Sequence, residues 1–179
     1  KLYLTSSYYD QKSTYGITRY DANQGNFTFS GFYEFEYLTR AFLKTGLSYK
    51  YQKIDEVIAF NDTTNKTYAG DYDKTESIPG VFLESSYSFL NDKASIMAGI
   101  RFDNHNQYGL VVTPRALVRW QPDKRVVFRV SGGTGFRTIN LFSEYSSIMA
   151  SARNIVITET LEPEKIINYG ADVLVYFGS

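Results

Sequence analysis

Apolar and polar residues alternate with a period of two along most of this chain, and helical periodicity is hard to find. In residues 27–37 the odd positions are aromatic apart from Gly31, while the even positions include Thr28, Ser30, Glu34 and Glu36. The same alternation recurs over 2–9, 41–53, 81–90, 94–103, 110–120, 125–133 and 166–177. The pattern therefore predicts an all-β fold of about eight strands.

The expected connections alternate between short and long. Short links are predicted at 38–41, 91–93 and 121–124, and long ones at about 10–25, 54–78, 104–109 and 136–165. Short links at one end and long links at the other are typical of an antiparallel up-and-down transmembrane β-barrel. Strands of about 10–13 residues, rising about 3.3 Å each and tilted by about 45°, cover an apolar band of about 25 Å. Soluble sandwiches use strands of about five or six residues.

The charged residues predict which face meets lipid. A charge at the bilayer midplane costs about 2–4 kcal/mol on the outer face of a barrel, so the polar faces are expected to point inward. The charged residues on those faces are Glu34, Glu36, Lys44, Lys50, Glu84, Arg101, Asp103, Arg115, Arg119, Arg129 and Asp172. The three arginines at 115, 119 and 129 either form a basic channel for anions or pair with acids on whatever fills the barrel.

Aromatic residues near the expected strand ends fit the girdles that flank a membrane band. They are Tyr49, Tyr51, Tyr87, Phe89, Trp120 and Phe177. Two local features are also predicted. Pro114 removes a ladder donor, so a bulge or weakened pairing is expected there. In the hairpin through 91–93, Glu84 is expected opposite Arg101.

The composition excludes several classes of protein. The 179 residues carry 19 basic and 19 acidic side chains, whereas nucleic-acid binding usually needs a basic excess. The chain has no cysteine and one histidine, which excludes disulfides, thiolate metal sites and two-histidine metal sites. It has no apolar run of about 18 residues and no signal-peptide pattern at its first residues. Its 17 % aromatic content suits strands and surfaces that are apolar on one side and wet on the other.

No enzyme motif emerges. The glycines of "SGGTGF" lack the Gly-Lys-Ser/Thr of a phosphate loop, and no nucleophile elbow is present. His105 could work with Asp103 as a base, contact haem or a metal chelate, or be a loop histidine on the outer rim. Glu162 and Glu164 could bind a cation or form a solvated strand entry around Pro163. We expect no enzyme, no catalytic residue, no resident metal and no cofactor.

Two stretches carry a family resemblance. The stretch "GTGFRTINLFSE", followed by "LEPEKIINYGADV", resembles the TonB-dependent outer-membrane receptors. The stretches "AGIRFDNHNQYG" and "VVTPRALVRWQPDKRVVFRVSGGTGFR" are similar to the hairpins that precede that element. The resemblance runs over residues 94–177, is similar in style to receptors of Bacteroidetes-type bacteria, and departs from the family at Ile139, where proline is frequent.

The resemblance implies a 22-stranded barrel plugged by an N-terminal domain of the same protein. Such receptors lie in the bacterial outer membrane and import an iron-siderophore, haem, cobalamin or a glycan with energy passed on by TonB. Residues 1–179 are then expected to be part of the barrel, with the plug domain, the TonB-contacting segment and the remaining strands absent. The expected partners are the plug, TonB, outer-membrane lipid and a small-molecule or metal-chelate ligand, with no nucleic acid.

In such a receptor the inward charges would face the plug, and the long loops would close over the ligand. The expected ligand contacts are Tyr68, Tyr72, His105, Tyr108, Arg137, Phe142 and Tyr145, since ligand sites combine aromatic and placed polar groups. Arg137 could instead pair with a carboxylate of the inner wall. The glycines at 132, 133 and 135 would permit backbone bends at the rim.

Two other readings stay open at this point. The first is a complete eight-stranded outer-membrane barrel with an adhesive or lipid-modifying role, because about eight strands suffice to close a barrel. The second is a soluble β-sandwich that binds carbohydrate through its tyrosines.

Overall fold

The computed structural model describes residues 1–179 except 62–66, 145–148, 151–153, 155, 157–160 and 178–179. One antiparallel sheet of eight strands, paired in chain order, makes up nearly all of the described chain. The strands are β1 (Leu2–Tyr15), β2 (Thr18–Leu38), β3 (Ala41–Phe60), β4 (Gly70–Phe89), β5 (Ala94–His105), β6 (Gly109–Asp123), β7 (Val126–Arg137) and β8 (Glu164–Val175), with a short helix α1 (Leu141–Glu144) between the last two. The predicted all-β, up-and-down architecture is confirmed.

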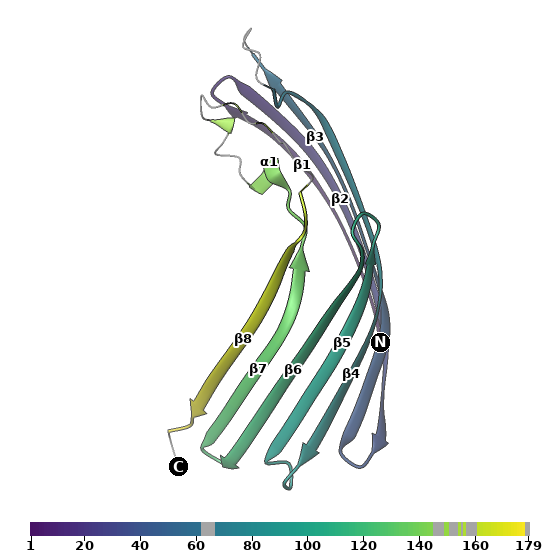
Figure 1. Ribbon diagram of the computed structural model, residues 1–179, viewed down its shortest axis with the longest axis vertical. Coiled ribbons are helices and arrows are strands. Elements are labelled where there is room, and N and C mark those ends of the chain that lie inside the picture. The colour runs from purple at the N-terminus through teal and green to yellow at the C-terminus, as the bar shows by residue number, and fades with distance from the viewer. Residues whose placement is uncertain (62–66, 145–148, 151–153, 155, 157–160, 178–179) are drawn as a thin grey trace.

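The sheet is curved and open. Its two edge strands, β1 and β8, lie apart, and no pairing joins them among the described residues (Figure 1). The described part of the segment between β7 and β8, including α1, lies on the concave side of the sheet, at the end where β2 and β3 project (Figure 1). The sheet is therefore a wall whose concave face is covered at that end, and the eight strands as described do not close a small barrel of their own.

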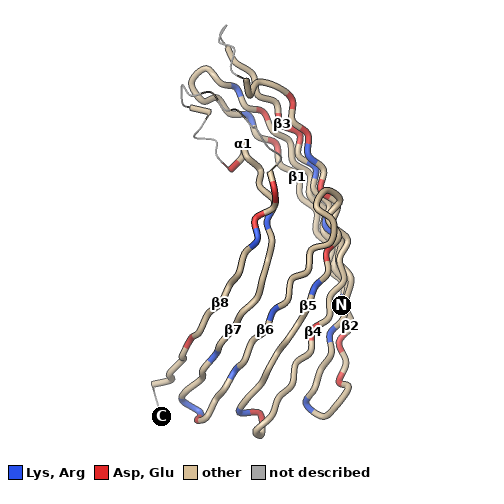
Figure 2. The backbone as a smooth tube through the Cα atoms, viewed as in Figure 1, with Lys and Arg blue, Asp and Glu red and all other residues tan. Residues whose placement is uncertain are grey.

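The register of the strands puts the charged side chains on one face of the sheet and the apolar side chains on the other. Glu34, Lys44 and Glu84 are partners across β2, β3 and β4, so they share one row of one face. The apolar residues between them fall on the other face and are well exposed, as at Leu47 (60 %) and Val130 (58 %). Figure 2 shows charged residues along all the strands and close together at the outer ends of β7 and β8.

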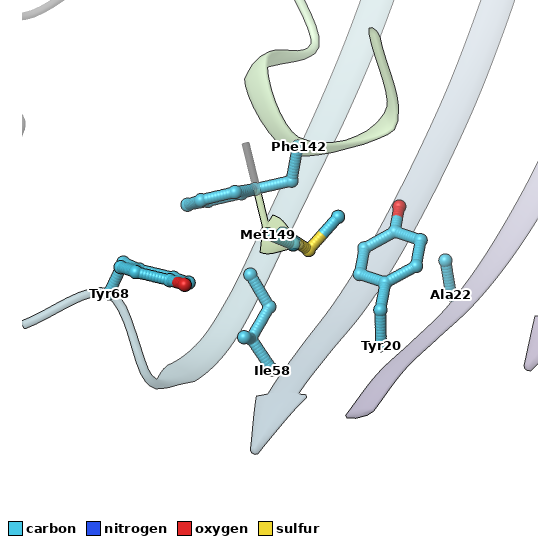
Figure 3. Packing of buried hydrophobic residues seen from close by; sticks show 6 residues of the cluster. All are labelled: Tyr20, Ala22, Ile58, Tyr68, Phe142 and Met149. Carbon is cyan, nitrogen blue, oxygen red and sulfur yellow. The ribbon is translucent and has the colours of Figure 1, made fainter. Parts of the chain in front are cut away.

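A buried apolar cluster identifies the concave face. Tyr20 and Ala22 of β2 and Ile58 of β3 pack against Phe142 and Met149 of the β7–β8 segment (Figure 3). Tyr68 completes this cluster and is 2 % exposed. These strand positions have the same parity in the register as the charged row. The charged residues predicted to point inward therefore lie on the concave face.

Three strands are much longer than predicted. β2, β3 and β4 have 21, 20 and 20 residues, and β1 and β2 are joined by a tight turn at Gly16 and Ile17. The long links expected at 10–25 and 54–78 are therefore wrong over most of their length. Polar residues occupy both faces of these stretches, as with Lys53 and Gln52, so the alternation is lost although the ladder continues.

The other connections follow the prediction more closely. The short links fall at 39–40, 90–93 and 124–125, and the long link between β7 and β8 is present. Arg40, Asn91 and Asp92 adopt φ values of 65°, 53° and 65°, the left-handed conformation that tight turns require. The link expected at 104–109 is only a three-residue turn at 106–108, because β5 continues to His105.

The predicted pair of Glu84 and Arg101 is wrong. Glu84 is opposite Gly99, and Arg101 is opposite Phe82, because the 90–93 turn sets the register two residues away from the expected one. Gly99 has no side chain, so Arg115 of β6 reaches over β5 and binds the carboxylate of Glu84. Glu84 also lies 4.0 Å from the Lys44 ammonium.

Pairing is weakened at Pro114, as predicted. β6 and β7 pair from Asp123 and Val126, at their shared turn, as far as Arg115 and Gly133. The ladder between them stops there, although both strands continue. Pro114 still lies opposite Ile100 of β5. The expected aromatic girdle is present at one end of the sheet, where Tyr87 stacks on Phe89 at 5.8 Å and Trp120 on Phe128 at 5.4 Å.

Of the remaining girdle residues, Phe177 lies at this same end, and the two tyrosines of β3 mark a second level. Tyr49 and Tyr51 lie in the middle of β3, with Tyr49 6.4 Å from the ring of Phe27. Phe177, which follows β8, is 94 % exposed. Beyond Tyr51 the convex face becomes charged, beginning with Lys53 and Asp55. The apolar band of β3 therefore ends at these tyrosines, and the strand continues past it.

Candidate ligand-binding cavity

A cavity of about 420 Å³ lies on the concave face, between the middle of β3–β5 and the segment that follows β7. We call it the lumen cavity. Its lining combines charged and amide side chains with two apolar ones: Lys50, Gln52, Glu76, Ile78, Arg101, Asp103, Phe136, Arg137, Thr138, Asn140 and Glu144. Four strands and α1 contribute to it, so its shape depends on the register of the whole sheet.

Glu76 is the buried centre of the wall. Its side chain is 3 % exposed, and its carboxylate lies 2.9 Å from the Lys74 ammonium and 3.9 Å from that of Lys50. Lys74 also donates to the carbonyl of Ile139, at 3.1 Å, and to the side chain of Asn140, at 3.0 Å. One ammonium thus holds the segment after β7 against β4, because a buried charge requires such partners.

His105 is buried beside Glu76 rather than exposed on a loop at the rim. It is the last residue of β5, and its Nε2 lies 3.9 Å from Glu76 Oε1. The amide N–H of Gln107 donates to Nδ1 at 3.1 Å, so the proton of the neutral ring is on Nε2 and faces the carboxylate. The ring of Tyr108 covers the histidine at 4.7 Å.

Two hydrogen-bond acceptors, on Asp103 and Ser48, fix the guanidinium of Arg101 over Gly80. The guanidinium donates from Nε to Asp103 and from Nη2 to Ser48, both at 2.6 Å. These contacts cross β4 at Gly80, where a Cβ atom would lie 2.1 Å from Asp103 Oδ1. Asp103 is 5 % exposed and Arg101 is 40 % exposed, so the acid lies in the wall and holds the arginine toward the cavity.

Arg137 closes the outer end of the wall. Its guanidinium lies 3.1 Å from Glu144 of α1 and 3.1 Å from Glu164 of β8. Glu144 also accepts a hydrogen bond from the backbone N–H of Asn140 at 3.0 Å, which organises the turn before α1. Arg137 therefore ties β7, α1 and β8 together, in keeping with the expectation that it pairs with a wall carboxylate.

The charges in the wall balance each other. Lys50 and Lys74 lie against Glu76, Arg101 against Asp103, and Arg137 against Glu144 and Glu164. That gives four cations and four acids, so these side chains carry no net charge. Its chemistry is a dense set of placed donors and acceptors, which suits a polar ligand bound by many hydrogen bonds.

Only some of the residues predicted to contact ligand lie at the lumen cavity. Arg137 lines the lumen cavity, and His105 lies in the wall behind it. Tyr68, Tyr72 and Phe142 belong to the apolar cluster and its border, where the ring of Phe142 lies tilted against that of Tyr72 at 4.7 Å. Tyr108 donates to the carbonyl of Leu161, and Tyr145 lies outside the described residues. Their roles as ligand contacts stay predictions.

The charged row below the cavity includes the residues predicted to face the plug. Arg129 pairs with Asp172 at 3.0 Å, and Lys44 lies 4.4 Å above the ring of Phe32. Arg119 is opposite Arg129 in the register and donates to Gln121. Glu36 accepts a hydrogen bond from the backbone N–H of Arg40 at the short turn. That these residues face a plug stays a prediction.

Sequence reasoning missed Lys74 and Glu76, because residues 54–78 were expected to form a loop. The signal was present in the alternation of Tyr72, Lys74, Glu76 and Ile78, which all fall on the concave face. Asn140 gave no signal, because its contact depends on how the β7–β8 segment folds back.

No metal centre or membrane-crossing helix is recorded in the described part of the chain. Within the described ranges, no three acidic or histidine side chains gather as metal ligands. None of the helices found in these ranges is long and apolar enough to cross a membrane.

The comparisons with known proteins concern the whole sheet. No curated protein matches the sequence. Among solved structures, the siderophore receptor PirA from Pseudomonas aeruginosa matches with a TM-score of 0.62 at 13 % identity, over 99 % of this chain and 36 % of that one. This chain thus spans about a third of the length of the receptor it matches, and the likeness is one of fold. Residues 2–179 match the family described as TonB dependent receptor-like, beta-barrel, and the chain therefore belongs to this family of bacterial outer-membrane proteins.

Proposed function

We propose that the chain forms part of the wall of an outer-membrane receptor that binds a scarce nutrient in the lumen cavity and imports it with TonB-transmitted energy. The observation that carries this proposal is the cavity itself, whose charged lining is fixed by hydrogen bonds and covered by the β7–β8 segment. Convergent polar groups in a concave site support a role in ligand binding.

We further propose that strands outside residues 1–179 complete the barrel and that a plug domain fills it. The open sheet supports this, since β1 and β8 each present an unpaired edge among the described residues. In lipid such edges must be paired. Arg119 and Arg129, opposed on the concave face, would be stabilised by acids of the plug, because like charges directly opposite each other repel.

The candidate ligands are an iron-siderophore, haem, cobalamin and a glycan. PirA is a siderophore receptor, but its 13 % identity to this chain is a likeness of fold and leaves the four classes open. The balanced charges of the wall support a ligand recognised by many hydrogen bonds more than by net charge.

The first test is uptake in a strain that lacks the full gene. We expect it to lose import of one of the four ligand classes, and we expect the full gene to restore import only when TonB is present. Unchanged uptake of all four classes would sink the proposal.

The second test addresses the cavity. Arg101→Gln in the full-length receptor should weaken binding of the identified ligand by about tenfold or more, since charge-assisted hydrogen bonds contribute about 1.5–3 kcal/mol. Lys12→Gln, on β1 and away from the cavity, is the matched control and should bind normally. Equal affinity in the two variants would remove the lumen cavity as the site.

A further inference from the structure

The wall has an opening between β6 and β7. The two strands pair only as far as Arg115 and Gly133, yet β6 begins at Gly109 and β7 ends at Arg137. Over the outer stretches 109–114 and 134–137, β6 pairs only with β5 and β7 only with β8 among the described residues. Backbone groups that point into the gap from both sides therefore have no ladder partner across it.

A cavity of about 580 Å³ occupies this opening. We call it the lateral groove. Leu110 and Val112 of β6 form one wall, and Phe136 of β7 and Ile167 of β8 form the other. Tyr108 closes the outer end by donating to the carbonyl of Leu161 at 3.0 Å, and the pair of Arg115 and Gly133 closes the inner end.

The groove opens onto the convex face, which meets lipid in this family. Leu110, Val112 and Ile167 are 65 %, 42 % and 77 % exposed, and they continue the apolar rows of that face. Phe136 lines the lumen cavity as well, so the two cavities meet at this residue. The groove is therefore a thin place in the wall, between lipid and lumen.

Its depth in the membrane follows from the strand length. From Val126 to Gly133 is seven residue steps, which at about 3.3 Å each and a tilt of about 45° rise about 16 Å. The apolar band of such barrels is about 25 Å, so the groove spans its outermost part and the start of the headgroup region. Acyl chains and their ester linkages meet at this level.

The groove suits an occupant that is apolar toward its inner end and carries hydrogen-bond acceptors toward its outer end. Unpaired backbone N–H groups are costly in lipid unless an acceptor reaches them. Lys165 and Glu162 both line this groove, and the ion pairs of the described residues leave the Lys165 ammonium without a carboxylate partner. Ester and phosphate oxygens are acceptors, and a phosphate also matches the lysine charge.

We propose that the lateral groove binds one phosphorylated, ester-linked lipid of the outer leaflet. An acyl chain lies between Leu110, Val112 and Ile167, and the phosphate is held by Lys165 and by backbone N–H groups of the gap. The bound lipid completes the wall where the ladder is open. A peptide strand is the rival occupant and is favoured less, because the lining side chains are apolar and continuous with the lipid-facing surface.

The test is lipid retention by the delipidated full-length protein, measured by native mass spectrometry. The probes are dioleoyl phosphatidic acid and dioleoylglycerol, which share acyl chains and esters and differ in the phosphate. We expect one phosphatidic acid to be retained about tenfold more tightly than dioleoylglycerol. Lys165→Gln should abolish this preference.

Val112→Trp should fill the groove and lose the retained lipid. Val118→Trp is the matched control, because Val118 lies on the same face of β6, is equally exposed at 42 %, and is in the paired part of the strand. Equal retention by the two variants, no retained lipid on the native protein, or a retained peptide would overturn the proposal.

Hydrogen exchange of the amides of residues 110–113 that point away from β5, into the gap, is a second test. These amides should exchange slowly in the presence of phosphatidic acid and quickly after delipidation. Slow exchange in both states would mean that a peptide strand closes the gap, and the lipid site would be abandoned. Neither measurement needs a transported ligand, so a negative result leaves the proposed import function standing.

Discussion

Replacement of Gly80 by alanine should destabilise the wall of the lumen cavity through one identifiable clash. The new Cβ atom would lie 2.1 Å from Asp103 Oδ1 and 2.8 Å from Ser48 Oγ. Because real Cβ atoms do not approach so closely, the Asp103 carboxylate must move by about 1 Å, away from the 2.6 Å hydrogen bond that it accepts from Arg101.

The expected magnitude combines two effects. Overpacking costs about 1–3 kcal/mol, and a hydrogen bond to a charged group contributes about 1.5–3 kcal/mol. We expect Gly80→Ala to lower the free energy of unfolding by about 2–4 kcal/mol in the otherwise native protein. In an Asp103→Ala background the carboxylate is gone, and the same change should cost less than about 1 kcal/mol.

The assay is urea unfolding of the full-length protein and the three variants in detergent micelles, arranged as a double-mutant cycle. Gly25→Ala is the control, since an added Cβ there meets nothing within 4 Å. It should change stability by no more than about 1 kcal/mol. An equal cost of Gly80→Ala with and without Asp103 would refute the reasoning.

Three further predictions concern the covered part of the concave face. Lys74→Met should destabilise the protein by about 3 kcal/mol, because the buried carboxylate of Glu76 would lose its nearest partner and keep only the Lys50 ammonium at 3.9 Å; urea unfolding should show partial recovery when Glu76→Gln is added. Phe142→Ala should detach the β7–β8 segment, since removing a buried phenylalanine costs about 3–5 kcal/mol; limited proteolysis should then cut that segment faster than in the native protein. Burial and the carboxylate of Glu56 raise the pKa of Tyr20 above its ordinary value of 10. The contribution of the neutral Tyr20 hydroxyl to the stability of the fold is therefore complete below pH 10, and it is lost as the pH rises from 10 toward the raised pKa of the folded state. Tyr20→Phe should weaken this alkaline loss of stability, as measured by unfolding between pH 9 and 11.

The sequence predicted the strands well where one face is apolar and the other polar. The alternation around Leu47 and Val130 reports a strand between lipid and lumen, and both residues are exposed on the convex face as expected. The prediction failed along the outer parts of β2, β3 and β4. There Lys53 and Asp55 place charge on the face that is apolar lower down, so the pattern that defines a membrane strand disappears while the hydrogen-bonded ladder continues.

The cavity was predictable only in part. The inward direction of Arg101 follows from the pleat, but its partners depend on register, and a shift of two residues exchanged the expected Glu84 for Asp103 and Ser48. The position of Asn140 depends on the path of the β7–β8 segment, which no periodicity encodes. Long-range contacts of this kind require the folded backbone.

The orientation of β3 in the membrane tests the central claim most directly. Residues 1–179 contain no cysteine, so single cysteines can be introduced along residues 42–59 in a cysteine-free background of the full-length protein and spin-labelled in lipid vesicles. The odd positions from 43 to 51 should be accessible to oxygen dissolved in the lipid, the even positions should be shielded from it, and the odd positions from 53 to 59 should be accessible to a water-soluble relaxant. Lipid exposure at the even positions, or no alternation at all, would contradict the account of this sheet as the wall of an outer-membrane receptor.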